Sequence, residues 1–339
     1  EGVPAGQWII GYGMYMDKVL GDGMSRETPR RSLDQIFPHN PVIIMEQTSH
    51  AMFVNSSALA LVGVNKNTPD PQGGKYMKGR RGELNGVLVD NAGDIAMEIA
   101  VNSLAHKEAL FYDGIMYGLE EAAKHGITTV GDGRTYWKRG MYEAWLAVAQ
   151  RDELTARVSL RPWIYPTVAM QEQLLFLAKV YQPDTAQLLI VDQVKMYSDG
   201  VPENGTARVL EPYADTWFPE SPYGINYIPF VQMKDWLKRL NLLGYGAHIH
   251  ALGDRGIREA LDAVASVRKE VSTRQYSITH LSMMDRADIP RFAELDVDAD
   301  IQVGEARHSH EEHMRDYLGL IAYKRAQALT YRPLKALAE

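Results

Sequence analysis

The chain has 339 residues, of which 45% are hydrophobic, and a formal net charge of −7 from 36 basic and 43 acidic side chains. This acidic balance argues against a protein that holds nucleic acid or an anionic membrane through a basic face. The chain has no cysteine, which excludes disulfides, cysteine-ligated zinc and a thiol nucleophile, so any metal must bind nitrogen and oxygen ligands.

Residues 1–100 contain clusters of proline, glycine and charge at 67–74 and 78–82, and one short strand candidate at 42–45. We interpret this segment as an irregular insertion or cap. The chain begins without methionine, and no basic or apolar leader is visible. It also ends abruptly in a predicted helix over 325–339, so we expect the sequence to be a fragment.

From residue 101 to 339, predicted helices and strands alternate. The apolar patterns predict helices over 104–124, 141–151, 170–181 and 230–243, and a further helix with Asp254 as its N-cap. They predict strands over 127–130, 156–164, 191–197, 245–250, 276–280 and 300–303. This alternation predicts an α/β fold with a parallel sheet covered by helices, either open or closed into a barrel.

Histidines stand at the ends of two neighbouring predicted strands. His248 and His250 point to the same side of one strand, and His280 ends the next. Neutral imidazole is a common zinc ligand, so His250 and His280 are candidate metal ligands. The alternative is that each ring only forms a hydrogen bond to a neighbouring loop.

Lys195 lies inside the apolar strand 191–197, where a charged ammonium group is costly unless it is paired or neutralised. A desolvated lysine can act as a base or nucleophile, or take up carbon dioxide to become a carbamate. The alternatives are a side chain that extends to solvent or pairs with Asp199. Reactive side chains at successive strand ends favour a barrel over an open sheet.

Several motifs resemble the amidohydrolase superfamily, in the branch called amidohydrolase family 3, which includes N-substituted formamide deformylases. The lysine motif is similar to residues 194–201 with Glu203 and 211–213. The histidine motifs resemble 250–255 and 278–280 with 288–292, and 300–302 resembles the next strand. Residues 49–59 and 68–74 are similar to the branch's insertion between barrel strands one and two.

This resemblance implies a (β/α)8 TIM-type barrel, with 1–100 as the insertion and 101–339 as barrel strands two to seven. It implies one or two divalent metal ions, usually zinc, held by Lys195 as a bridging carbamate and by His250 and His280. The implied reaction is hydrolysis of non-peptide C–N bonds of the amide or formamide type by metal-activated water. His50, Asn55, His248 and Asp199 are weaker candidates for contacts with the substrate; for His50 and Asn55 the alternative is a local cap and turn.

The family's His-x-His pair of strand one would precede Glu1, and the aspartate of strand eight, the general base, would follow Glu339. We therefore expect this chain alone to bind metal weakly and to be poorly active. One alternative is a non-catalytic binding or regulatory protein that has lost its metal site; another is a lyase that uses Lys195 as a Schiff base, which would leave the histidines unexplained.

No apolar stretch reaches the roughly 18 residues of a membrane helix, so we expect a soluble, cytoplasmic protein that does not bind membranes or nucleic acid. The expected partner is a small amide-type substrate. A homo-oligomer is a further possibility, because an open barrel edge favours association.

Overall fold

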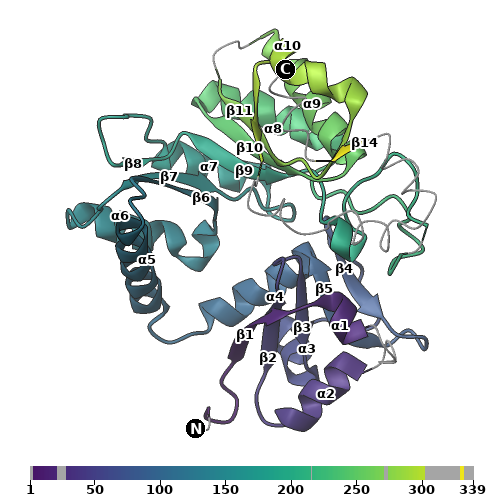
Figure 1. Ribbon diagram of the computed structural model, residues 1–339. Helices are drawn as coiled ribbons and strands as arrows, with labels where there is room; N and C mark the ends of the chain where they lie inside the picture. Colours follow the sequence, from purple (N-terminus) through teal and green to yellow (C-terminus); the bar gives the residue numbers. More distant parts are fainter. Residues whose placement is uncertain (1–2, 21–27, 215, 271–273, 302–328, 332–339) are drawn as a thin grey trace. The chain divides into compact units, whose positions relative to one another are not determined.

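The computed structural model describes residues 3–20, 28–214, 216–270, 274–301 and 329–331 (Figure 1). The chain divides into two compact units, Glu1–Lys107 and Glu108–Glu339. Among the described residues, no helix is both long enough and apolar enough to cross a membrane.

The first unit is a five-stranded sheet with helices, in the strand order β1-β2-β3-β5-β4. Strand β1 pairs with β2 in parallel, and the other neighbours pair antiparallel. Its strands are β1 (Ile9–Met14), β2 (Val42–Glu46), β3 (Ala51–Val54), β4 (Gly74–Lys78) and β5 (Leu84–Asp90). Its helices are α1 (Met16–Leu20), α2 (Thr28–Ile36), α3 (Ser56–Val62) and α4 (Asn91–Asn102).

The expectation of an irregular segment over 1–100 is therefore wrong. The glycine and charge cluster at 78–82 belongs to the hairpin between β4 and β5, where the amide of Gly79 donates to the carbonyl of Glu83. Strand β5 is buried along its whole length. Such a strand shows no alternation of polar and apolar residues, which is the signal that sequence reading needs.

The second unit carries the alternating helices and strands that the sequence predicts. Its strands are β6 (Thr129–Thr135), β7 (Arg157–Pro162), β8 (Leu189–Ile190), β9 (Gln193–Tyr197), β10 (Gly246–Ala251), β11 (Tyr276–His280), β12 (Met283–Asp285), β13 (Val297–Asp300) and β14 (Leu329–Tyr331). Its α-helices are α5 (Lys107–Lys124), α6 (Met141–Gln150), α7 (Met170–Val180), α8 (Phe230–Leu243), α9 (Asp254–Arg268) and α10 (Ile289–Glu294). Short 3-10 helices are η1 (Trp137–Arg139), η2 (Pro202–Asn204) and η3 (Arg286–Asp288).

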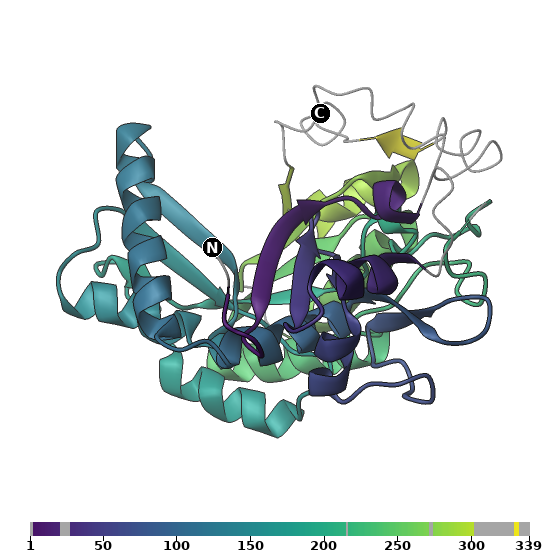
Figure 2. The same cartoon turned by 90° about the horizontal axis from the view of Figure 1, so that it is seen from below.

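A run of parallel strands forms the framework of this unit. Strand β6 pairs with β7, and β9, β10, β11 and β13 pair in that order, all in parallel. A parallel bridge between Trp163 and Lys195 connects the end of β7 to β9. Strands β9, β10 and β11 lie side by side in Figure 1, and Figure 2 shows α5 beside β6 and β7. Apolar residues of these strands and of α5 to α9 share one core.

Three predictions of elements need correction. The last parallel strand, β13, spans Val297–Asp300, whereas the sequence predicted a strand over 300–303, of which residues 302 and 303 lie outside the described residues. Within the predicted helix 325–339, β14 is a strand that pairs antiparallel with β12, and the remainder of that prediction lies outside the described residues. Helix α9 begins at Asp254 with Gly253 in the capping position, because the Asp254 carboxylate accepts hydrogen bonds from the amides of Leu210 and Arg255.

A row of polar side chains crosses the parallel strands, from the carboxyl end of β7 to the amino ends of β9, β11 and β13. Arg161 Nε donates to Gln193 Oε1 at 3.0 Å, Gln193 Nε2 donates to Gln275 Oε1 at 2.9 Å, and Gln275 Nε2 donates to Asp298 Oδ2 at 2.9 Å. Gly246 of β10 pairs with Gln193 and has no side chain to block this row. The row thus joins β7, β9 and β13 through Gln275, the residue that precedes β11.

Candidate metal centre

The two histidines proposed as metal ligands lie in contact at the carboxyl ends of β10 and β11. The ring centroids of His250 and His280 are 4.7 Å apart with an interplanar angle of 68°. His280 pairs with Ala251, so regular alternation would direct it away from the face of His250. Its φ of 79° and the φ of 50° at Leu281 break that alternation and allow the rings to meet. A non-glycine residue rarely adopts such backbone angles.

Lys195 lies in the middle of β9 and is only 4% exposed. Burial lowers the pKa of its ammonium group well below the ordinary value, and the charges of Arg134 and Arg161 lower it further, whereas Asp300 raises it. The carboxylate that acts on Lys195 is thus Asp300 of β13. An amine held neutral in this way can accept carbon dioxide or act as a base.

His248 lies next to Lys195, because the two residues are paired in the register of β9 and β10. Its Nδ1 is 2.7 Å from Ser277 Oγ, and its Nε2 is 3.7 Å from Asp300 Oδ2. Burial, followed by the charges of Lys195, Arg161 and His280, lowers the pKa of His248 to about 2. The imidazole is therefore neutral at every physiological pH.

Aromatic rings cover one side of these groups. The ring of Tyr197 stacks on that of His250 with centroids 3.9 Å apart and planes at 9°. Trp163 and Tyr227 pack against Tyr197, with centroids 4.5 Å and 5.1 Å away. Arg134 lies over the Trp163 ring at 4.2 Å and donates to the Tyr197 hydroxyl at 2.9 Å. These contacts fix the Tyr197 ring and exclude water from one face of His250.

Asp199 holds the backbone segments that follow β9 and β10 in place through hydrogen bonds. It is fully buried and accepts hydrogen bonds from the backbone amides of Leu252, Gly253 and Arg208 at 3.0, 2.8 and 2.8 Å. Burial raises the pKa of its carboxyl to about 7, although these three hydrogen bonds act in the opposite direction. Its Oδ1 lies 3.8 Å from Nε2 of His250, which is 3.0 Å from the Gly200 carbonyl oxygen.

His50 and Asn55 lie in the first unit. His50 Nδ1 is 2.6 Å from Asp90 Oδ1, and both side chains are buried. Asn55 is the N-cap of α3: its Oδ1 accepts from the amides of Ala58 and Val42, both at 3.0 Å. Asn55 thus has a structural task, and a contact of either residue with substrate stays a prediction.

Arg161, Arg134 and Asp300 were not among the predicted site residues. Their signal is weak in the sequence: Arg161 lies two positions before Trp163 on a strand, which places both on one face. Which face that is, and that it also carries Lys195, follows only from the pairing register. Within the described ranges, no group of three or more His, Asp or Glu side chains is close enough to hold a metal ion. The nitrogen donors that fit a metal there are the two imidazoles and the neutral lysine.

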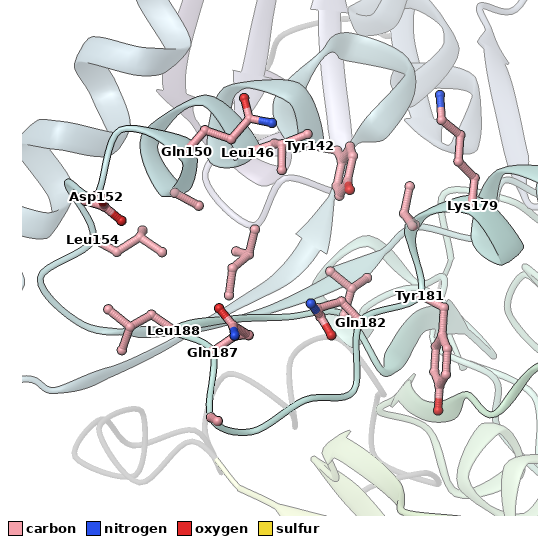
Figure 3. A pocket seen from close by; sticks show the side chains of 15 residues that line it. Tyr142, Leu146, Gln150, Asp152, Leu154, Lys179, Tyr181, Gln182, Gln187 and Leu188 are labelled. Carbon is pink, nitrogen blue, oxygen red and sulfur yellow. The ribbon is translucent and has the colours of Figure 1, made fainter.

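A separate pocket of about 580 Å³ lies away from these residues (Figure 3). Side chains of α6, such as Leu146 and Gln150, form one wall, and Gln187 and Leu188 before β8 form another. None of the candidate metal ligands lines it. It is built from the segments that lead into the strands, whereas barrel enzymes place their sites at the strands' carboxyl ends.

Comparison with known proteins identifies relatives over most of the chain. The family model described as the amidohydrolase family matches residues 1–339. The protein described as "putative amidohydrolase YtcJ" of Bacillus subtilis is 27% identical over 309 residues, which cover 88% of this chain and 54% of that protein. The N-substituted formamide deformylase of Arthrobacter pascens is 22% identical over 312 residues, covering 87% of this chain and 53% of that protein.

Among solved structures, the crystal structure of an uncharacterized metal-dependent hydrolase from Pyrococcus horikoshii OT3 is similar in fold, with a TM-score of 0.63 and 19% identity. The match covers 92% of this chain and 59% of that one. The matches to the two curated relatives cover 54% and 53% of their lengths, so the chain spans about half the length of each.

Proposed function

The chain belongs to the amidohydrolase family, and from this premise we propose that it forms the central part of a metal-dependent hydrolase for non-peptide C–N bonds of the amide or formamide type. The observation that carries the proposal is Lys195, a buried amine with a strongly lowered pKa, on the same parallel strands as the contacting rings of His250 and His280. Nothing in the core packing alone requires a lysine at this position. We further propose that β6, β7, β9, β10, β11 and β13 are strands two to seven of a (β/α)8 barrel.

In this proposal, His250 and His280 hold a divalent metal ion, with zinc as the first candidate, and Lys195 binds as a carbamate. The metal, when bound, lowers the pKa of a water molecule and polarises the substrate carbonyl. The chain's own residues prepare the site. The burial that keeps Lys195 uncharged favours its reaction with carbon dioxide, and the stacked Tyr197 ring holds the His250 imidazole in one orientation.

Three surrounding residues position these groups. Asp300 raises the pKa of Lys195 and lies 3.7 Å from His248 Nε2, and Arg161 lowers the pKa of both Lys195 and His248. Asp199 fixes the backbone after His250 through its bonds to the amides of Leu252 and Gly253. The name of the formamide deformylase relative makes formamides the first substrates to assay, followed by other amides and cyclic ureas.

The first test is the metal content of the chain, measured by plasma mass spectrometry after purification without chelator. We expect Lys195→Met to lose most of the bound zinc while the fold, followed by circular dichroism, is preserved, because methionine fills a similar buried volume. Lys238→Ala, at an exposed lysine on α8, is the matched control and should keep the zinc of the parent chain.

Bicarbonate separates a carbamate from a plain amine ligand. If Lys195 binds metal as a carbamate, added bicarbonate should raise the zinc content of the parent chain and should have no effect on Lys195→Met. Zinc content that is the same in both proteins, with and without bicarbonate, would contradict the role of Lys195.

The alternative function is a non-catalytic, barrel-derived binding or regulatory protein. The observation in its favour is the lack, within the described residues, of a three-ligand group of His, Asp and Glu side chains. It predicts no bound zinc in any variant, and no hydrolysis of formamides or other amides. The proposed hydrolase requires both bound zinc and measurable hydrolysis.

A further inference from the structure

A small basic pocket in the first unit contains none of the candidate metal-site or substrate-site residues. It has a volume of about 100 Å³, well below the roughly 300–1,000 Å³ of pockets that take drug-sized ligands. Its walls come from α2 and from the hairpin between β4 and β5. The lining residues are Arg30, Arg31, Gly79, Arg81, Glu83, Leu84 and Asn85.

Three arginines line this pocket: Arg30 and Arg31 from α2, and Arg81 from the hairpin. Within the part of the chain that the structure describes, none of the three forms an ion pair or a side-chain hydrogen bond. The nearby carboxylate of Glu83 is 3.2 Å from Lys66 Nζ, so its charge is already balanced. Neighbouring arginine side chains that no carboxylate of the described residues pairs with repel one another, and an anion between them would relieve that repulsion.

The local backbone adds to this positive field. Arg30 and Arg31 lie close to the amino end of α2, and its first turn has no acidic residue. Amide groups at a helix amino end carry partial positive charge, and cationic side chains there are unfavourable unless an anion is bound.

The buried side-chain amide of Asn85 is a second observation, independent of the arginines, that points to a ligand. Asn85 is 2% exposed, and its Oδ1 accepts a hydrogen bond from the amide of Val87 at 2.9 Å. Its Nδ2 is buried and has no hydrogen-bond partner among the described residues. An unsatisfied buried donor costs about 1–3 kcal/mol, and Asn85 is one of the residues that line the pocket, so this donor points to a missing acceptor.

Gly86 brings these groups together. A Cβ at this position would lie 2.4 Å from the Val54 carbonyl oxygen and 2.8 Å from Arg30 Cβ, and its φ is 93°. Only glycine therefore allows α2 to approach β5 so closely at Arg30. This close packing holds Arg30 beside Asn85. The wall of the pocket is therefore fixed by the packing of α2 against β5.

We propose that Arg30, Arg31, Arg81 and the Asn85 amide bind a small tetrahedral oxyanion, a phosphate group either free or as the monoester of a small molecule. Guanidinium groups match phosphate oxygens in geometry and charge, and the amide donates to a further oxygen. A larger groove of about 710 Å³ shares Arg30, Glu83 and Leu84 with the pocket and has room for the organic part of a monoester.

The test is titration of the full 339-residue chain with inorganic phosphate, followed by phosphorus NMR and calorimetry at constant ionic strength. We expect saturable binding that weakens at least tenfold in Arg81→Ala and in Asn85→Asp. The aspartate keeps the acceptor for the Val87 amide but replaces the donor with a negative charge. Arg80→Ala is the matched control, because Arg80 is an exposed neighbour that does not line the pocket, and it should change the affinity less than twofold.

Several outcomes would overturn the proposal. These outcomes are phosphate binding by the parent chain that does not saturate, binding weakened as much by Arg80→Ala as by Arg81→Ala, and binding retained by Asn85→Asp with an unchanged melting temperature. Phenyl phosphate distinguishes the two sources of the anion: tighter binding than inorganic phosphate indicates a monoester, and equal binding indicates the free ion. Because Arg81 is exposed, the result with Arg81→Ala does not depend on whether Asn85→Asp folds.

Discussion

Lys195 and His248 are two bases that the fold holds uncharged side by side. The same causes act on both: burial, and the positive charge of Arg161. A positive charge on Lys195 would lower the pKa of His248 further. Neutral nitrogen atoms are available as ligands or bases without first losing a proton.

The lowered pKa of His248 predicts a loss of stability in acid. Its folded-state pKa of about 2 lies below the ordinary value of 6.5, so the unfolded chain binds a proton that the folded chain excludes. Stability is complete above pH 6.5 and falls as the pH drops below that value. Between pH 7 and pH 5.5, this group alone should reduce the free energy of unfolding by about 1 kcal/mol.

Urea unfolding of the metal-free chain at the two pH values measures this loss. The variant His248→Asn should show a smaller loss between pH 7 and pH 5.5 than the parent chain. His125→Gln, at an exposed histidine after α5, should leave it unchanged. An equal loss in parent and His248→Asn would show that other groups cause the acid sensitivity.

The site residues differ in how far the sequence reveals them. His250, His280 and Lys195 stand out because a strand end or an apolar strand is an unusual place for them. Arg161 and Asp300 do not stand out, because a charged residue near the end of a strand is ordinary. Only the register, in which Thr279 pairs with Asp300, brings that carboxylate to the face of Lys195.

Among the elements, those with regular periodicity were predictable. Helix α8 has the predicted bounds, Phe230–Leu243, and β11 has the predicted bounds, Tyr276–His280. The sheet of the first unit was not predictable, because strands such as β5 are wholly buried and contain a glycine, Gly86. The α/β class of the fold is confirmed, and closure of the barrel stays a prediction.

Within single helices, substitution of Gly253 and of Gly118 by alanine should change the free energy of unfolding in opposite directions. At Gly253, the cap position of α9, a Cβ would lie 1.9 Å from the Arg208 carbonyl oxygen, which also accepts bonds from the amides of Arg255 and Gly256. Because backbone atoms cannot move aside, we expect Gly253→Ala to lower the free energy of unfolding by about 2–3 kcal/mol or more.

Gly118, within α5, is the matched position, because a Cβ there meets no atom within 4 Å. Gly118→Ala should raise the free energy of unfolding by about 0.5–1 kcal/mol through the better helix propensity of alanine. Denaturant unfolding of both variants tests the pair. A loss of stability in Gly118→Ala, or none in Gly253→Ala, would contradict the packing described here.

At the scale of the whole molecule, the two units have separate cores. Leu88 is fully buried in the first unit's core and Ile278 in the second unit's core. Truncation of either residue to alanine should cost about 2–5 kcal/mol. Hydrogen exchange followed by mass spectrometry should show that Leu88→Ala loses amide protection within 1–107 and that Ile278→Ala loses it within 108–301. Equal losses in both units from either variant would mean that they unfold as one.

The polar row from Arg161 to Asp298 has a consequence for how the second unit reaches its native state. Its members are separated by long stretches of sequence, and parallel strands must close large loops before they can pair. A slip of one residue in any of these strands would turn its member of the row to the opposite face. The hydrogen bonds can therefore form together only after every strand has found its register. We expect the row to assemble late in folding, when it stabilises the correctly aligned sheet and no misaligned one.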